Sequence, residues 1–363
     1  MTQPAPTRKH ALAEEARRAT EGAIPSEEAQ TGQAKEHTEA GEGGSGGGES
    51  TGTVILAGAV NLLIAAAKFV GGMISHSSAM LSESAHSVAD TITEVLLFVA
   101  LKRGNKPADD KHPFGYGRET YFWAFLASLA TFVAGAGFSI YQGIETIISG
   151  ESEGPPLVSY IVLAVSFVLE GSSLLKAVKQ VRGSAARFKT SSRRYLAATT
   201  DTTVKAVTFE DSAALVGLVL AALGLFLEQM TGSTMWDGIA SILIGLLLIV
   251  VASALARANA SLLIGQAASP VLEKQLREEI SELDLVVSVP FLLTSVIGPG
   301  QLVVAAKVDF VDEASAGDIE RVADEAERRL VERHEGVRYV FLDPTSGHTA
   351  RAEVHPVPDA EDD

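Results

Sequence analysis

Runs of about 20 apolar residues recur through the middle of this chain of 363 residues. A run of this length crosses the roughly 30 Å hydrocarbon layer of a bilayer as an α-helix. The sequence therefore predicts an α-helical membrane protein with six transmembrane helices. The predicted spans cover residues 53–74, 78–101, 119–147, 156–181, 199–228 and 235–258.

The loops between these spans alternate in basic content. Five Lys or Arg residues lie in each of the segments 102–118 and 182–198, and none lies in 75–77, 149–156 or 231–234. Basic loops stay on the cytoplasmic side of a membrane. We therefore expect both termini in the cytoplasm and the chain in the inner cell membrane.

The chain divides into four predicted regions. Residues 1–50 are rich in Glu, Ala and Gly, which is typical of a disordered tail. The six spans form a transmembrane domain at 51–262. Residues 266–350 follow a helix–strand–strand–helix–strand pattern, which predicts a cytoplasmic α+β domain of the ferredoxin-like αββαβ type. A second disordered tail, acidic in composition, is expected at 351–363.

Two local patterns indicate the elements of this α+β domain. Along 302–310 apolar residues alternate with others, which is typical of a strand with one buried face. Ser315 precedes an apolar helical stripe that ends at Leu330, so Ser315 is predicted to cap a helix. The helices are expected to cover one face of the sheet.

Composition excludes some kinds of site and partner. The chain has no cysteine, so it has no disulfide, and any metal ligands must be nitrogen or oxygen donors. The formal net charge of −16 argues against nucleic acid as a partner.

The second span carries four ionisable side chains on one helical stripe. It contains Glu83, His86, Asp90 and Glu94, in the spacing i, i+3, i+7 and i+11. A charged residue in hydrocarbon costs about 2.5–3.5 kcal/mol on insertion scales, so such residues are usually functional. His86 and Asp90 are four residues apart near mid-span and can converge on one ligand. Glu83 and Glu94 lie nearer the ends, where we expect them to reach water.

The fifth span carries Glu210 and Asp211 near its middle. Asp211 lies on a rough polar stripe, and Glu210 points about 100° away from it. We therefore expect Asp211 to face the interior, while the role of Glu210 stays open. One imidazole with two or three carboxylate oxygens makes a four-coordinate site suited to Zn²⁺. Co²⁺, Fe²⁺ or Mn²⁺ would accept the same donors.

Other charged residues in the spans have structural interpretations. Glu170 is interpreted as an ion-pair partner of Lys68, with a proton site as the alternative. Lys68, Lys205 and Asp237 are interpreted as snorkelling or helix-packing groups.

The segment SSAMLSESAHSVADT, followed by DDKHPFGYGRET after the second span, resembles the cation diffusion facilitator family. That family has a mid-membrane pair four residues apart in span two and then an Asp/His–Phe-Gly-x-Gly loop. His86 and Asp90 match the pair in its His-x-x-x-Asp form, which the family associates with zinc. The stretch FEDSAA in span five is similar to the zinc-transporter-nine-type branch of the family. The resemblance covers about residues 53–345.

The resemblance implies a homodimeric secondary transporter. It would export a divalent metal, zinc above all, from the cytoplasm in exchange for protons by alternating access. The metal is then a substrate, and no cofactor is expected. The implied transport ligands are His86, Asp90, Asp211 and Glu210.

The resemblance also implies two differences from other members. Some bacterial members bind a peripheral ion in the loop, and Asp109 and His112 match two of its ligands, but Tyr116 takes the third position. A weak or absent loop site is expected.

Members also often bind zinc between tail domains through several His. Here the strands VPFLL, AAKVDF and VFLDP contain no His, and only Asp343 fits. His334, His348 and His355 are interpreted as surface residues.

Two other functions stay open at this point. Metal ligands on facing helices could activate water, as in an intramembrane metallohydrolase, although the chain has no His-Glu-x-x-His or nucleophile motif. The other alternative is a metal-sensing scaffold that does not transport.

Overall fold

The computed structural model describes residues 51–150, 156–187 and 190–346. The tails predicted at 1–50 and 351–363 lie outside the described residues. The domain bounds given above stay predictions.

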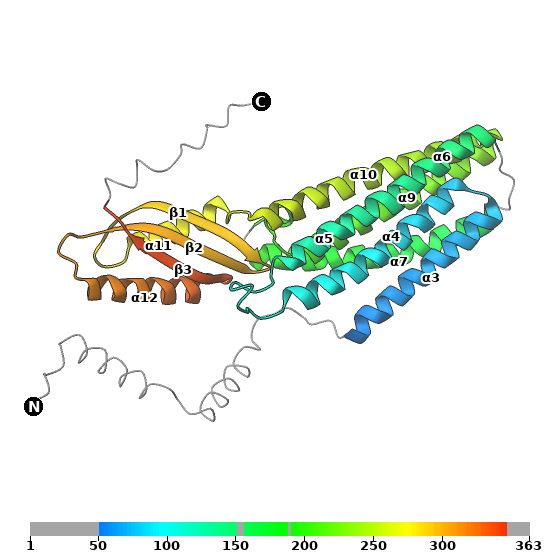
Figure 1. Cartoon of the computed structure of the whole chain (residues 1–363). Coiled ribbons are helices and arrows are strands. Elements are labelled where there is room, and N and C mark those ends of the chain that lie inside the picture. Colours follow the sequence, from blue (N-terminus) through cyan, green and yellow to red (C-terminus); the bar gives the residue numbers. More distant parts are fainter. Residues whose placement is uncertain (1–50, 151–155, 188–189, 347–363) are drawn as a thin grey trace, which may run out of the picture. The chain divides into compact units, whose positions relative to one another are not determined.

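Long helices form the part of the chain that carries the apolar runs (Figure 1). Five described helical segments are long and apolar enough to cross a bilayer, and Asn61–Ser75 gives a shorter apolar helix. The predicted helical membrane protein is confirmed, and the first crossing remains a prediction. The elements are α3 (Thr51–Ser75), α4 (Ser78–Gly104), α5 (Glu119–Ala130), η1 (Thr131–Gly137), α6 (Phe138–Ser149), α7 (Pro156–Arg187), α8 (Ser192–Ala198), α9 (Thr202–Thr231) and α10 (Met235–Ile264).

Two helices extend beyond the predicted spans into a basic loop. α4 continues to Gly104 and α7 continues to Arg187. An apolar run marks the hydrocarbon layer, and helical hydrogen bonding does not stop at its edge. α9 begins later than predicted because Asp201 caps it, with its carboxylate accepting hydrogen bonds from two backbone N–H groups of the first turn.

The third span changes its winding in the middle. Thr131–Gly137 is a π-helical segment between α5 and α6. Beyond it α6 crosses α10 so closely that a Cβ on Gly143 would lie 2.5 Å from the carbonyl oxygen of Gly238. Only glycine permits this approach. On the α4 side, the hydroxyl oxygens of Thr131 and Thr93 lie 3.2 Å apart.

Asp237 on α10 anchors the first turn of α4. Its carboxylate accepts hydrogen bonds from the Ser77 hydroxyl at 2.7 Å and from the Ser78 hydroxyl at 2.8 Å. The backbone N–H groups of Ser78 and Ala79 also donate to it. A carboxylate at a helix N-terminus is favoured by the helix dipole. The predicted helix-packing role of Asp237 is thus confirmed, and this contact fixes α4 relative to α10.

The C-terminal part of the described chain is a small α+β unit, as predicted. Its sheet has the order β1-β2-β3, with β1 antiparallel to β2 and β2 parallel to β3. The parallel pair needs a crossover connection, which α12 provides. The elements are α11 (Pro270–Ser281), β1 (Val286–Gly298), β2 (Gln301–Phe310), α12 (Ala316–Arg333) and β3 (Val337–Pro344).

The two local patterns predicted for this unit are confirmed. Alternate residues of β2 from Leu302 to Val308 are buried. They pack with Ile280 of α11 and Leu330 of α12 in one apolar core. Ser315 caps α12 and forms a reciprocal capping box with Asp318.

We predict that Asp237→Ala lowers the stability of the membrane-spanning helices. The carboxylate is fully buried, and its removal leaves several buried donors at the start of α4 without an acceptor. We expect a loss of roughly 2 kcal/mol or more. Thermal unfolding of the detergent-solubilised protein measures this. Glu145→Ala, an exposed carboxylate on α6, is the control and should leave the unfolding temperature unchanged. An Asp237→Ala protein as stable as the wild type would contradict the anchoring role.

Candidate metal site

His86 lies inside the helix bundle with no hydrogen-bond partner. Only 1% of its surface is exposed, and neither ring nitrogen has a partner among the described residues. Its Nδ1 lies 3.4 Å from Oδ1 of Asp90 one turn later, which is too far for a good hydrogen bond. Asp90 Oδ1 is also buried without a hydrogen-bond partner there. Buried polar atoms are normally satisfied, so this pair is suited to bind something further.

Glu210 and Asp211 of α9 both face protein. Glu210 is 7% exposed and interacts with Asp90, Glu94 and Thr131. Asp211 is half-buried and interacts with Ser173 on α7. Each carboxylate has a buried oxygen without a hydrogen-bond partner among the described residues.

Asp211 was expected to be the better candidate to face the interior, but Glu210 is the more buried of the two. A polar stripe shows one favoured face of a helix, but α9 packs against α4, α7 and α10. Residues 100° apart on such a helix can both be inside the bundle. Glu210 approaches the α4 side, and Asp211 approaches α7.

The four predicted ligands do not form one coordination sphere in this structure. Among the described residues no three His, Asp or Glu side chains lie close enough together to hold a metal ion. His86 and Asp90 are brought together, and the α9 carboxylates stand apart from them. Carboxylates of like charge repel one another, and only a shared cation would draw them to one point.

Lys68 of α3 forms a second buried charge cluster beside this site. Its ammonium group lies 2.7 Å from Glu170 Oε1 on α7 and 3.1 Å from Glu83 Oε2 on α4. It also donates to the hydroxyl of Ser87 at 2.9 Å. We call Lys68, Glu83 and Glu170 the lysine triad.

The contacts of the lysine triad can be compared with three predictions made from the sequence for Lys68, Glu83 and Glu170. The predicted ion pair of Lys68 with Glu170 is confirmed. The expectation that Glu83 reaches water was wrong, because Glu83 and Lys68 are both 0% exposed. A snorkelling Lys68 is wrong for the same reason. Glu83 lies on the same helical stripe as His86, and the neighbouring α3 carries Lys68. These two facts are the sequence signal that could have predicted the burial of Glu83.

The other ionisable residues of the spans also have neighbours. Glu94, expected to be wet, is half-buried and accepts a hydrogen bond from Asn61 on α3. Lys205 is buried near the start of α9. Neither adds a third ligand to His86 and Asp90.

The loop after α4 is closed by its own hydrogen bonds. Asp109 Oδ1 accepts from the backbone N–H of His112 at 2.8 Å, and Oδ2 accepts from the Tyr116 hydroxyl at 2.7 Å. The Tyr116 hydrogen bond, with smaller contributions from backbone donors, lowers the pKa of Asp109 below its ordinary value. The Tyr116 hydroxyl thus donates a hydrogen bond to the carboxylate that would have to bind the metal. This contact favours the expected weak or absent loop site, which stays a prediction.

The histidines of the α+β unit do not gather into a site within the described chain. His334 was interpreted as a surface residue, but it is half-buried, and its Nε2 lies 2.9 Å from Oε1 of Glu279 on α11. Asp343 lies 3.9 Å from Lys307 of the neighbouring strand. His348 and His355 lie outside the described residues.

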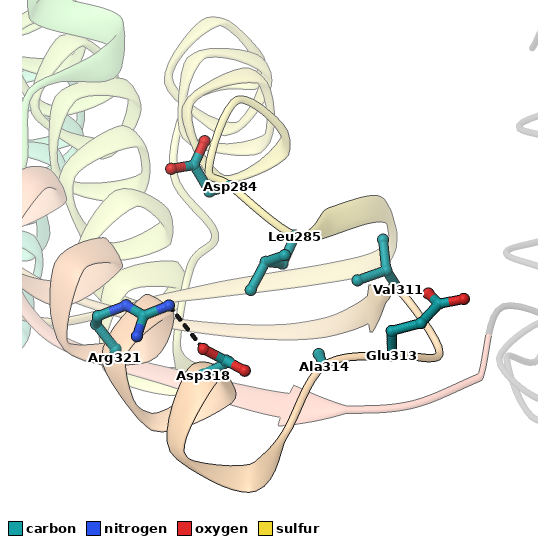
Figure 2. A pocket seen from close by; sticks show the side chains of 7 residues that line it. All are labelled: Asp284, Leu285, Val311, Glu313, Ala314, Asp318 and Arg321. Carbon is teal, nitrogen blue, oxygen red and sulfur yellow. Dashed lines mark hydrogen bonds and ion pairs between the residues drawn. The ribbon is translucent and has the colours of Figure 1, made fainter.

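A hollow in the same unit is lined by three acidic residues, three apolar residues and one arginine (Figure 2). Its one lining guanidinium, Arg321, points to Asp318 and donates to it at 2.8 Å. Hydrogen bonds from Ser315 and then from Arg321 lower the pKa of Asp318 below its ordinary value. Asp318 also closes the capping box of α12, so the charges here serve the helix start.

Known proteins share the helical part of this chain. A model of the cation efflux transmembrane domain matches residues 54–264. Metal tolerance protein C4 of Arabidopsis thaliana is 33% identical over 250 residues, 69% of this chain and 55% of that protein. The mitochondrial proton-coupled zinc antiporter SLC30A9 of Mus musculus is 30% identical over 257 residues, 71% of this chain and 45% of that protein. The chain thus spans about half the length of these two relatives. An uncharacterized transporter of Methanocaldococcus jannaschii is 26% identical over 289 residues, 78% of this chain and 94% of that protein.

We predict that Tyr116→His creates a metal site in the loop. The substitution removes the donor that occupies Asp109 and adds a second imidazole beside His112, giving three nitrogen or oxygen ligands. Metal content after gel filtration in Zn²⁺ should rise by about one ion per chain. Tyr116→Phe is the matched control, since it removes the hydroxyl without adding a ligand; it should bind no extra zinc and should raise the pKa of Asp109. Equal zinc content in wild type and Tyr116→His would contradict this account.

Proposed function

Because the chain belongs to the cation efflux family, we propose that it transports a divalent metal cation through the imidazole and carboxylates of α4 and α9. The observation that carries the proposal is His86, which is buried inside α4 beside Asp90. Within the described part of the chain, both ring nitrogens of His86 and one oxygen of Asp90 lack a hydrogen-bond partner, so all three atoms are available to bind a metal. A neutral imidazole nitrogen next to a carboxylate is a donor pair for a transition-metal ion. A core histidine that only filled space would be expected to find a hydrogen-bond partner.

Zinc is the metal that we propose as substrate. One imidazole nitrogen with oxygens from Asp90, Asp211 and Glu210 meets the four-coordinate preference of Zn²⁺. These residues lie within the region 54–264 that matches the cation efflux transmembrane domain, and proteins named as zinc antiporters are among the relatives of this chain. Because the α9 carboxylates stand apart from His86 in this structure, we propose that metal binding draws α9 toward α4.

Exchange with protons follows from the chemistry of the ligands. Metal binding needs a neutral His86 and ionised carboxylates, so protons and metal compete for the same groups. An inward proton gradient would load these groups with protons on the outer side and release the metal there. We propose alternating access as the route and a homodimer as the working unit. The basic loops support cytoplasmic termini and export from the cytoplasm, in the inner cell membrane.

Two alternative functions were an intramembrane metallohydrolase and a metal sensor that does not transport. The cation efflux family and the zinc antiporter relatives are transporters and not enzymes, which removes the metallohydrolase alternative. A non-transporting sensor would bind metal at His86 and Asp90 without moving it across a membrane. Flux measurements separate this alternative from transport.

We predict that His86→Ala and Asp90→Ala each abolish zinc flux. Each substitution removes one of very few ligands and lowers the coordination number below what tight binding needs. Flux into proteoliposomes with an imposed pH gradient should fall to the level of empty liposomes, while the gel-filtration profile stays that of the wild type. Tyr116→Phe, in the loop, is the control and should keep wild-type flux. Full flux in Asp90→Ala would refute the site. Zinc binding by a wild type without flux would favour the sensor.

A second prediction concerns the two α9 carboxylates. Glu210→Gln and Asp211→Asn should each weaken zinc binding by about tenfold or more, because each removes a charged oxygen donor from the assembled site. Equilibrium binding of Zn²⁺ to the solubilised protein measures this. Glu228→Gln, further along α9 and near its end, is the control. If one of the two variants bound zinc like the wild type, that residue would not be a ligand.

A further inference from the structure

The lysine triad is short of one positive charge. It combines one ammonium group with two carboxylates, all within α3, α4 and α7. Lys68 and Glu83 are fully buried, and the Glu170 side chain is 14% exposed. A net negative charge in a site of low polarity is costly unless a further cation or a proton neutralises it.

Lys68 has no free N–H group with which to bind the remaining carboxylate oxygens of the triad. An ammonium group has three donors, and those of Lys68 are used by Glu83, Ser87 and Glu170. One oxygen of each carboxylate, Glu83 Oε1 and Glu170 Oε2, is buried and has no hydrogen-bond partner among the described residues. Glu83 Oε1 is moreover packed against Gly217 of α9, where a Cβ would collide with it. The space around this oxygen admits a proton far more easily than a metal ion.

The charges of the triad also interact with those of the proposed metal ligands. His86 interacts electrostatically with Glu83, Lys68 and Glu170. Asp90 interacts with the same three groups, and Asp211 of α9 interacts with Glu170. A divalent cation bound at His86 and Asp90 would therefore repel a proton held in the triad. The same cation would stabilise two ionised triad carboxylates.

We propose that the lysine triad is a separate proton-binding site, which holds one proton on Glu83 when no metal is bound and releases it when metal binds. The triad goes from Lys⁺, one carboxylate and one carboxylic acid to Lys⁺ and two carboxylates, and the proton leaves to water. This inference rests on the proposed metal transport. It adds a proton carrier that is not itself a metal ligand, beside the metal ligands for which protons also compete.

The test is infrared spectroscopy of the full-length protein, in which a buried carboxylic acid gives a C=O stretching band distinct from that of a carboxylate. The metal-free wild type should show such a band, and Zn²⁺ should remove it. Glu83→Gln and Glu170→Gln should each show a weaker band than the metal-free wild type, because the contribution of the triad is lost. Gln keeps an acceptor for Lys68 and makes the triad neutral without a proton. Glu145→Gln, exposed on α6, is the control and should keep the band.

Proton release gives a second measure. Zn²⁺ is titrated into the protein in weak buffer with a pH indicator. Glu83→Gln and Glu170→Gln should each release about one proton fewer per zinc than the wild type while still binding zinc. Each glutamine variant by itself tests the proton site. The proposal therefore stays testable if one of the two variants fails to fold.

The outcomes separate the two proposals. A metal-free wild type without the band, a band that both glutamine variants retain at wild-type strength, or zinc binding that leaves the band and the proton count unchanged would each overturn the proton site. A band weakened in the glutamine variants, together with a wild type that binds no zinc, would establish protonation of the triad and refute the proposed transport of zinc.

Discussion

Every carboxylate inside the helix bundle must be neutralised, because water is not there to solvate it. The structure shows three ways in which this is done. Asp237 uses hydroxyl and backbone donors at the start of α4. Glu83 and Glu170 use the ammonium group of Lys68. Asp90 lies beside the imidazole of His86 and keeps an oxygen that has no hydrogen-bond partner among the described residues. The first arrangement is complete within the protein, the second leaves one carboxylate charge that the proposed proton would neutralise, and the third is the one for which we propose a metal cation.

α4 is the element on which all three arrangements depend. Its first turn is held by α10 through Asp237, its N-terminal half contacts Lys68 through Glu83 and Ser87, and its middle presents His86 and Asp90. A shift of this helix would change all of them together. The proposed metal site and the lysine triad are therefore linked through one helix. In the proposed transporter, this link would be the physical basis for coupling metal and proton.

What could be predicted from the sequence depended on local periodicity. The apolar runs and the spacing of His86 and Asp90 follow from the helical repeat, and the burial of alternate β2 residues follows from the strand repeat. The burial of Glu210 and of Glu83 could not be read in this way. Each depends on which helices pack against its own, and α9 packs against α4, α7 and α10. The Tyr116 hydrogen bond to Asp109 likewise depends on the fold of the loop.

The central claim is that one imidazole and the carboxylates of α4 and α9 bind the metal. X-ray absorption spectroscopy at the zinc edge, on the wild-type protein loaded with one zinc per chain, tests it most directly. The account predicts a first shell of four light donors in which a single imidazole, near 2.0–2.1 Å, accompanies oxygens. The imidazole signal should be absent from His86→Ala. Two or more imidazoles around the zinc, or a spectrum that His86→Ala does not change, would contradict the account and place the metal elsewhere.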